Sequence, residues 1–417
     1  MKIQKYKNRI LLDFVSCLLI ITSHFINYII YSKYRVIFPD IILIVGILAV
    51  VALVLTLLLQ LRSRILRATI YAVLITIVFG DAMFEFGTTD IGFRFVAMMA
   101  TFAIALALVF FLREHTSTVL IGVFLAMLVS TVILGTLGTS ERDSATTASQ
   151  GAGDKTLPLI VHLILDEHMG TGGMTSRLPG GERIRQDLQE FYGRHGFRLF
   201  GNAYSQSFQT HASLAGALNF DIGGDPHRYL SKRRYGFALK ENAYLKRLSS
   251  SGYGVTIYQS DYFDLCSAST PAARRCLTYR PDNLESSEIP ALPITDRLGL
   301  VVSMYYSSFA VTKLARFFEP RVRQWLSRHN IDFPSLGLWH GRVGPIAVTP
   351  TFDRLVRDVS SAAGGMVFFA HLLMPHYPYV YDRTCKIRSP ISSWGLRQGV
   401  PEAISPDAAR QRHIASF

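Results

Sequence analysis

The segment from His371 to Asp382, HLLMPHYPYVYD, concentrates side chains that can do chemistry. It follows the apolar run Met366 to Ala370, and this run predicts a buried strand. Two histidines, an aspartate and three tyrosines therefore gather where the strand would end. Because α/β sheets usually hold ligands at the carboxyl ends of their strands, we expect this segment to form part of a site. Residues upstream must complete that site.

A pair of acids follows a second apolar run. Residues Pro158 to Leu165 are rich in β-branched side chains and predict a strand buried on both faces, directly before Asp166 and Glu167. Adjacent carboxylates at the end of such a strand repel each other and are costly to leave bare. A divalent ion (zinc, manganese, magnesium or calcium) would stabilise both, so both are candidate metal ligands. Alternatively, Asp166 only caps the following helix or loop.

A third polar element precedes a helix of small residues. Hydroxyl side chains dominate from Tyr204 to Thr210, and the sequence HASLAGALN follows. The free backbone N–H groups at a helix N-terminus favour an anion such as phosphate or sulfate. A nearby metal would lower the pKa of the Thr210 hydroxyl and make it a nucleophile. Taken alone, Thr210 as a simple N-cap is the plainer interpretation.

Other ionisable residues have plainer explanations. His162 lies inside the first predicted strand, where a packed core residue is expected. For His371 we expect a structural hydrogen-bonding role first and a ligand role second. Asp81 and Glu85 end the third apolar run of the chain. Ionisable groups at membrane depth indicate function, but at the end of a span these two could simply face water.

The first third of the chain has the composition of a membrane region. Hydrophobic residues make up 49% of the 417 residues, mean hydropathy is +0.26, and the excess lies before residue 140. Five apolar runs each reach the roughly 20 residues that a membrane-spanning helix needs: about 10–31, 40–61, 65–86, 92–112 and 117–138. A cleaved signal peptide is an alternative for the first run, but that run is long, lacks a cleavage site and precedes four others. Residues 1–138 are therefore predicted to be a five-helix transmembrane region.

The distribution of Lys and Arg predicts the orientation of these spans. The loops on the N-terminal side carry more of them than the opposite loops, which favours a cytoplasmic N-terminus. Five crossings then place the rest of the chain in the periplasm or outside the cell, anchored in the cell (inner) membrane. The net charge of +13 fits work near an anionic membrane surface, and nucleic acid is a poor partner there.

The cysteines agree with an oxidising compartment. Cys266 and Cys276 lie in one polar segment, and a disulfide between them is the favoured interpretation. Cys17 falls in the first apolar run and is expected to pack there. Cys385 is left without a partner, which is unusual for an external domain.

The rest of the chain is predicted to form one soluble domain. Residues 139–155 are small and polar, as in a linker, and the domain covers 156–417. Helical patterns alternate with buried strands, which predicts an α/β fold with a mostly parallel sheet. Residues 298–328 combine aromatic and basic side chains. They predict either an interfacial amphipathic helix or, equally, a core helix with a solvated basic end.

Together these segments resemble a known group. A strand ending in an acid, a Thr that opens a helix and a strand ending in His-x-Pro occur in this order in the sulfatase-like branch of the alkaline phosphatase superfamily. Five spans before an external domain resemble its membrane-anchored members, the phosphoethanolamine transferases and lipoteichoic acid synthases. The resemblance implies that Asp166, with Glu167, is a metal ligand and that Thr210 is nucleophile and metal ligand. It implies that His376 binds the charged group of the substrate or assists the leaving group.

The sequence departs from that group at one point. Its members carry a further Asp-His pair on a later strand, and this pair completes the metal site. Here Asp407 and His413 do not form such a pair, and Tyr262 stands where a histidine would follow Asp261. We therefore expect residues 156–417 to be a C-terminally truncated, incomplete form of an alkaline-phosphatase-like domain.

The expected function is a membrane-anchored, metal-dependent enzyme that transfers or hydrolyses a phospho- or sulfo-ester. A membrane lipid is the expected donor, and an envelope glycan or lipid is the expected acceptor. A true sulfatase is disfavoured, because no Cys/Ser-x-Pro-x-Arg sequence surrounds Thr210. The alternative, favoured by the missing Asp-His pair, is a non-catalytic or inactive truncated membrane protein.

Overall fold

The chain divides into two compact units. The computed structural model describes residues 2–32, 34, 38–61, 63–86, 91–137, 153–174, 180–200, 205, 207–221, 223–233, 236–266, 273–308, 321–322, 325–326, 343–376, 378–382 and 384–394. Met1–Glu141 and Pro290–Gly341 form one unit, and Arg142–Ile289 and Arg342–Phe417 form the other. Pro290–Gly341 thus groups with the N-terminal helices although it comes late in the chain. Asp407, His413 and most of the predicted linker 139–155 lie outside the described residues.

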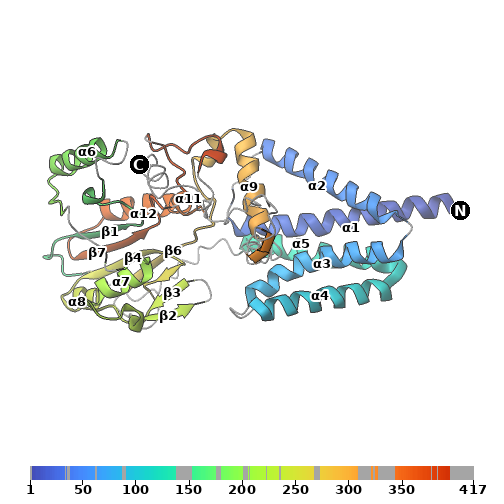
Figure 1. Ribbon diagram of the computed structural model, residues 1–417, viewed down its shortest axis with the longest axis horizontal. Coiled ribbons are helices and arrows are strands. Elements are labelled where there is room, and N and C mark those ends of the chain that lie inside the picture. Colours follow the sequence, from blue (N-terminus) through green and yellow to red (C-terminus); the bar gives the residue numbers. More distant parts are fainter. Residues whose placement is uncertain are drawn as a thin grey trace. The chain divides into compact units, whose positions relative to one another are not determined.

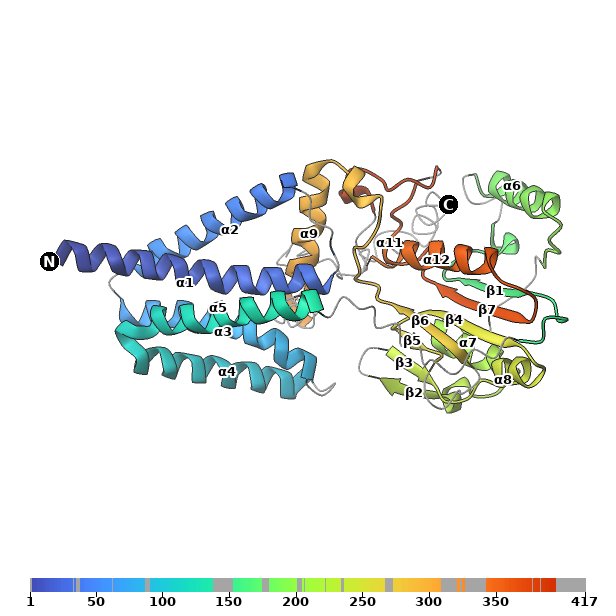
Figure 2. The same ribbon diagram turned by 180° about the vertical axis from the view of Figure 1, so that it is seen from behind.

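Long helices build the first unit (Figures 1 and 2). They are α1 (Lys2–Tyr31), α2 (Phe38–Leu59), α3 (Arg64–Phe86), α4 (Ile91–Leu112), the 3-10 turn η1 (Arg113–His115), α5 (Thr116–Leu137) and α9 (Ile294–Ser308). Helices α1 to α5 coincide with the five predicted apolar runs. Within the described chain, three stretches are long and apolar enough to cross a membrane: Lys7–Ile30, Ile42–Leu59 and Phe95–Ile133. Large apolar side chains on the outer faces, such as Ile65 and Phe111, are exposed, as expected of a surface that contacts lipid.

A buried carboxylate ties several of these helices together. Asp13 on α1 is fully buried, and its Oδ1 accepts hydrogen bonds from Arg67 Nη2 at 2.7 Å and Tyr71 OH at 3.1 Å, both on α3. Its Oδ2 accepts from Gln60, just after α2, at 3.1 Å, and Ser117 on α5 donates to Oδ1. Because a buried charge is tolerated only when it is paired and hydrogen-bonded, this network fixes how the helices meet.

A second buried ion pair holds α9 in the same unit. Arg297 on α9 donates from Nη2 to Asp40 Oδ1 at 2.9 Å, and Asp40 is fully buried at the start of α2. Tyr34 OH donates to Asp40 Oδ2, also at 2.9 Å. Removing one partner of such a pair leaves an uncompensated buried charge, so the pair strongly restrains α9.

Helix α9 includes the first part of residues 298–328, for which the sequence left two interpretations open. Leu300, Val301 and Met304 are buried, whereas Val302 and Tyr306 are about half exposed, so residues 298–308 form a helix that packs on one face. Of the remainder, only residues 321–322 and 325–326 are described.

The second unit is an α/β domain with a parallel sheet, as predicted. Its main sheet has the order β1-β7-β4-β6, and every neighbouring pair is parallel: β1 (Ile160–Leu165), β7 (Met366–Leu372), β4 (Gly254–Ser260) and β6 (Ala273–Tyr279). A smaller sheet has the order β2-β3-β5: β2 (Leu230–Arg233), β3 (Gly236–Leu239) and β5 (Phe263–Asp264). The helices are α6 (Gly181–Arg194), α7 (Thr210–Leu218), α8 (Ala243–Ser250), α11 (Gly344–Ala347) and α12 (Thr349–Ser360). Short 3-10 turns are η2 (Thr171–Gly173), η3 (Pro226–Tyr229), η4 (Ile289–Ala291) and η5 (Ile391–Trp394).

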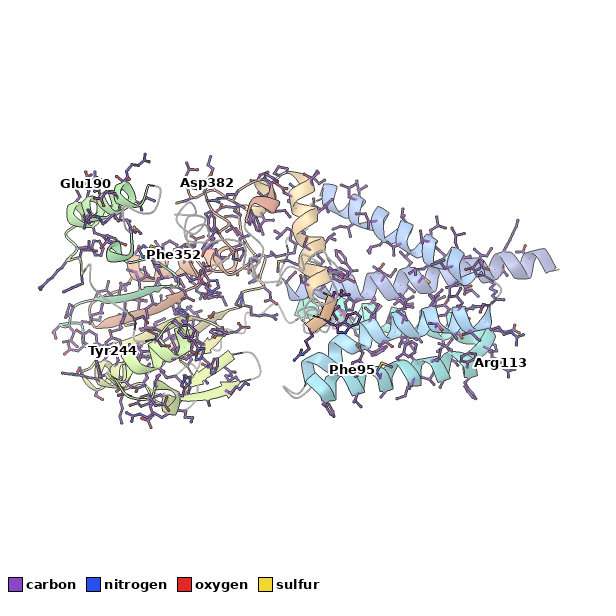
Figure 3. The ribbon with its side chains drawn as sticks, in the orientation of Figure 1. Phe95, Arg113, Glu190, Tyr244, Phe352 and Asp382 are labelled. Atoms are coloured by element: carbon purple, nitrogen blue, oxygen red, sulfur yellow. A yellow bond between two sulfur atoms is a disulfide. The ribbon has the colours of Figure 1, made fainter. Side chains whose placement is uncertain are left out.

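Helices cover both faces of the main sheet. On one face, Ala215 of α7 and Leu245 of α8 share a buried core with Phe369 of β7. On the other face, Leu355 of α12 packs in a core with Phe368. Figure 3 shows Tyr244 on α8 and Phe352 on α12 on opposite sides of the strands. The nearly complete burial of β4 and β7 follows from this double cover.

The expectation that β1 is buried on both faces is wrong. Val161 is 46% exposed and Leu163 is 41% exposed, whereas Ile160 and Ile164 pack in the core beside α7 and α8. The reason lies in the strand order, because among the described residues β1 stands at the edge of the sheet, next to β7.

The expected disulfide and the expected core histidine are both confirmed. Cys266 and Cys276 are bonded, while Cys385 is free and exposed. The ring of His162 packs edge-on against Phe369, and its Nδ1 lies 3.1 Å from the Tyr244 hydroxyl. Burial lowers the pKa of this histidine, so the folded state favours its neutral form.

The disulfide is expected to stabilise the α/β unit. Replacing Cys266 and Cys276 together by serine should lower its free energy of unfolding by about 2–3 kcal/mol, because the bond closes a short loop in the unfolded chain. The measurement is proteolysis in urea, followed on peptides of this unit within the full chain. Cys385→Ser is the matched control and should change stability by less than about 0.5 kcal/mol. Equal effects of the two variants on the free energy of unfolding would contradict the disulfide between Cys266 and Cys276.

Acid should destabilise the same unit partly through His162. Its pKa in the unfolded chain is near the ordinary 6.5 and its folded pKa is lower, so below pH 6.5 the unfolded state binds a proton that the folded state does not. The free energy of unfolding should therefore fall with acidification, by at most about 1.4 kcal/mol per pH unit for this group. His162→Gln should lose less stability than the wild type between pH 7.5 and 5.5. Parallel pH curves for the two proteins would refute this.

Candidate active site at the ends of β1 and β7

The pairing of β1 with β7 sets the position of the first two site residues. Ile164 pairs with His371, and the Asp166 N–H donates to the Leu372 carbonyl at 2.9 Å. Side chains alternate between the faces of a strand, so Asp166 projects on the same face as Ile164, and His371 on the same face as Phe369. Ile164 and Phe369 both pack in the core below α7. Asp166 and His371 therefore meet at the carboxyl edge of the sheet, on the face that carries α7.

Helix α7 brings Thr210 to the same point. The helix begins at Thr210, and the N-cap residue is Gln209, which makes no side-chain capping bond. Thr210 Oγ1 instead donates to Asp166, at 3.1 Å from Oδ1 and 3.5 Å from Oδ2. The interpretation of Thr210 as a simple N-cap is therefore wrong. The alternative for Asp166, a helix or loop cap, does not describe its contact with a hydroxyl 44 residues away.

His371 occupies an unusual environment. It is fully buried, its Nε2 lies 3.9 Å from Asp166 Oδ2, and among the described residues neither ring nitrogen has a hydrogen-bond partner. Burial lowers its pKa and outweighs the nearby Asp166 carboxylate, which acts in the opposite direction. A neutral imidazole presents a free lone pair. The structural hydrogen bond expected for His371 is not formed, whereas an unsatisfied buried ring beside a carboxylate fits a ligand role.

His376 and Glu167 also lie close to this carboxylate. The His376 Nε2 atom is 4.0 Å from Asp166 Oδ2 and 3.4 Å from Glu167 Oε1. Glu167 adopts a left-handed backbone conformation with φ of 62°, which is costly for a residue with a side chain. Tyr379 OH donates to Glu167 Oε2 at 3.2 Å. The strained turn and this hydrogen bond together hold the Glu167 carboxylate beside the strand end.

The last residues of the 371–382 segment have structural roles. The Tyr381 hydroxyl lies 3.0 Å from Thr349 Oγ1 on α12, and burial raises its pKa to about 12. Asp382 accepts a hydrogen bond from the Thr384 N–H at 2.8 Å and so stabilises a turn. Tyr377 lies outside the described residues.

Sequence reasoning missed Tyr279, the last residue of β6. Its hydroxyl donates to the His371 carbonyl at 3.2 Å and accepts from the Leu373 N–H at 2.8 Å, which fixes the end of β7. Burial raises its pKa, and the charges of Asp166 and Asp261 raise it further. Asp261, set aside in the sequence, is therefore a further carboxylate at this edge. A tyrosine at the end of the strand that contains Cys276 was the available signal.

The spacing of the polar atoms bears on metal binding. A tetrahedral ion with bonds of about 2.0–2.2 Å sets its ligand atoms about 3.3–3.6 Å apart. Here Asp166 oxygens lie 3.1 Å from the Thr210 hydroxyl, 3.9 Å from His371 and 4.0 Å from His376. The first of these distances is shorter than the expected range and the other two are longer. The buried His371 ring, which has no hydrogen-bond partner among the described residues, fits an ion beside Asp166. Within the described part of the chain, no three or more His, Cys, Asp or Glu side chains form a closed metal-binding group.

Comparisons with known proteins add nothing to this geometry. No protein family, curated protein or solved structure matches the chain significantly. The structure brings together the four residues expected in the site, Asp166, Glu167, Thr210 and His376. Their chemical roles remain predictions.

Replacing His371 should separate a structural role from a ligand role. His371→Leu should change the free energy of unfolding of the protein in chelator by less than about 1 kcal/mol, because the buried ring has no hydrogen bond to lose. His162→Leu is the matched control and should cost about 0.5–1.5 kcal/mol or more, because it breaks the contact with Tyr244. Urea unfolding followed on peptides of the α/β unit measures both. A larger cost at His371 than at His162 would show a structural role.

Proposed function

We propose that this chain is a membrane-anchored, metal-dependent enzyme of sulfatase-like type. It transfers or hydrolyses a phospho- or sulfo-ester on an envelope lipid or glycan. The observation that carries the proposal is the hydrogen bond from Thr210 to Asp166 at a strand end, with His371 and His376 on the same carboxylate. A hydroxyl held by a base, beside a second proton donor, is the arrangement that nucleophilic catalysis requires.

Each of these residues has its own role in the proposed reaction. Thr210 Oγ1 attacks phosphorus or sulfur and passes its proton to Asp166, so the new ester bond forms as the bond to the leaving oxygen breaks. His376 binds the charged group and donates a proton to the leaving oxygen. An acceptor hydroxyl or water then attacks the threonine ester and gives its proton to His376. As the bond to Thr210 Oγ1 breaks, Asp166 returns the proton that it took, so both residues are restored. An alcohol acceptor gives transfer, and water gives hydrolysis.

Asp166, Glu167 and Thr210 would hold a divalent ion, zinc, manganese, magnesium or calcium, with the unsatisfied His371 ring beside them. When bound, such an ion lowers the pKa of a ligating hydroxyl and neutralises charge that develops on the ester. Burial lowers the pKa of His371 and so favours the neutral imidazole, which is the form that binds a metal.

The proposal includes a location. We infer that α1 to α5 all span the cell (inner) membrane, with the N-terminus cytoplasmic and the α/β unit in the periplasm or outside the cell. The disulfide between Cys266 and Cys276 supports an oxidising compartment. A membrane lipid as donor and an envelope glycan or lipid as acceptor fit that location, and nucleic acid does not.

A non-catalytic membrane protein is the second candidate. The observation that favours it is that the described residues form no closed metal-binding group. Such a protein would keep the fold and the hydrogen bond of Thr210 but would show no turnover.

Thr210 variants of the full chain in detergent separate the two candidates. With zinc, manganese, magnesium or calcium supplied in turn, Thr210→Ala should lower hydrolysis of bis(p-nitrophenyl) phosphate at least about 10³-fold. Thr210→Ser should keep measurable turnover, and Thr210 carrying a p-nitrophenyl phosphate group should be found by mass spectrometry of the wild type after acid quench. The matched control is Ser213→Ala, one turn further along α7, which should leave the rate unchanged. Equal rates for the wild type and Thr210→Ala, or no turnover with any metal, would contradict the enzyme.

A further inference from the structure

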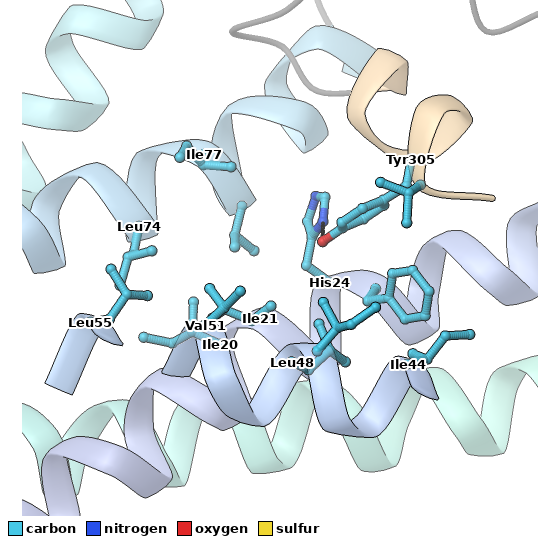
Figure 4. A pocket seen from close by; sticks show the side chains of 14 residues that line it. Ile20, Ile21, His24, Ile44, Leu48, Val51, Leu55, Leu74, Ile77 and Tyr305 are labelled. Atoms are coloured by element: carbon cyan, nitrogen blue, oxygen red, sulfur yellow. Dashed lines mark hydrogen bonds between the residues drawn. The ribbon is translucent and has the colours of Figure 1, made fainter. Parts of the chain in front are cut away.

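The helical unit contains an apolar cavity that the proposed chemistry does not use. It measures about 400 Å³ and lies between α1, α2, α3 and α9 (Figure 4). Ile21 on α1, Leu48 and Val51 on α2, and Ile77 on α3 are among its lining side chains. The volume falls in the range of about 300–1,000 Å³ that small-molecule sites occupy.

Among the described residues, the lining is hydrocarbon apart from His24 and Tyr305. These two polar side chains satisfy each other, because His24 Nδ1 lies 2.9 Å from the Tyr305 hydroxyl. Water in a cavity needs two or more polar partners, so this space favours an apolar occupant over water. An empty cavity of this size would leave the lining side chains without van der Waals contacts on one side.

A groove on the surface of α2 adjoins the cavity. It is lined by Ile42, Leu43, Gly46, Ile47, Val50 and Val51, and Ile47 and Val51 also line the cavity. Gly46 contributes no side chain, and an added Cβ there would have no neighbour within 4 Å. The groove therefore lies on the apolar surface of α2 directly next to the cavity, with the side chains of Ile47 and Val51 between the two spaces.

The depth of the cavity matches one leaflet of a bilayer. Its lining on α2 runs from Ile44 to Leu55, which at 1.5 Å per residue is about 16 Å. Half of the hydrocarbon thickness of a bilayer is about 15 Å. The polar end lies at the start of α2, where the ion pair between Asp40 and Arg297 is buried. An extended hydrocarbon chain parallel to α2 would fill this space.

We propose that the cavity binds one acyl chain of a membrane phospholipid, whose second chain lies in the groove on α2. The head group of this lipid lies at the end marked by His24 and Tyr305. The site takes its lipid laterally from the bilayer. This inference stands apart from the chemistry at Thr210, because every residue that carries it belongs to the helical unit.

Native mass spectrometry of the full chain tests the proposal. Phosphatidylethanolamine titrated into the detergent-solubilised protein should give one saturable bound lipid per chain. Leu48→Trp fills the cavity and should weaken this binding at least fivefold. The matched control is Leu53→Trp on the same helix, because Leu53 is 50% exposed and lines neither space. Binding that does not saturate, or that is equal in the two variants, would overturn the proposal.

A second measurement needs no variant. The unmodified chain is placed in phospholipid vesicles that contain a trace of phosphatidylcholine with a diazirine near the end of one acyl chain. After irradiation, labels should appear at lining residues such as Ile21 and Ile77. Labels confined to outward-facing residues such as Leu57 and Phe111 would show only surrounding lipid and would contradict the site. Neither result depends on turnover, so failure here and failure of the Thr210 chemistry are distinguishable.

Discussion

The parallel pairing of β1 with β7 is the constraint on which the candidate site depends. It sets the Asp166 backbone against Leu372 and puts the Asp166 carboxylate beside the buried His371 ring. Helix α7 then needs only to start at the right place for Thr210 to reach the same carboxylate. Without this register, an alternating side-chain pattern would place the two polar groups on opposite faces of the sheet. The hydroxyl of Tyr279 fixes the end of β7 at this edge of the sheet.

Local patterns in the sequence predict much of the fold. Length and hydropathy place the long helices, and apolar runs place β1 and β7, because these signals depend on neighbouring residues alone. Strand order is not local, so nothing near Val161 shows that β1 is an edge strand. The pairing of Arg297 with Asp40, 257 residues apart, is equally invisible in the sequence, and this contact makes α9 part of the helical unit.

The candidate site shows the same contrast between local sequence signals and contacts that form only on folding. Asp166, Thr210 and His376 could be selected because acids, hydroxyls and histidines at element ends are chemically conspicuous. The environment of His371 could not be predicted, since burial without a hydrogen-bond partner is a property of the folded state. The role of Tyr279 depends on β6 and β7 lying on either side of β4. The sequence thus indicates which residues have side chains capable of chemistry, while packing decides which of these side chains are left without a hydrogen-bond partner.

Calorimetric titration of the full chain with zinc and manganese tests the central claim most directly, in the wild type and in Asp166→Asn. If Asp166, Thr210 and His371 surround one metal site, the wild type binds one ion per chain and Asp166→Asn weakens binding by about tenfold or more. The substitution preserves the size of the side chain, so a folded variant reports on the charge alone. Absence of binding in the wild type, or equal affinities in the two proteins, would contradict a metal site at Asp166.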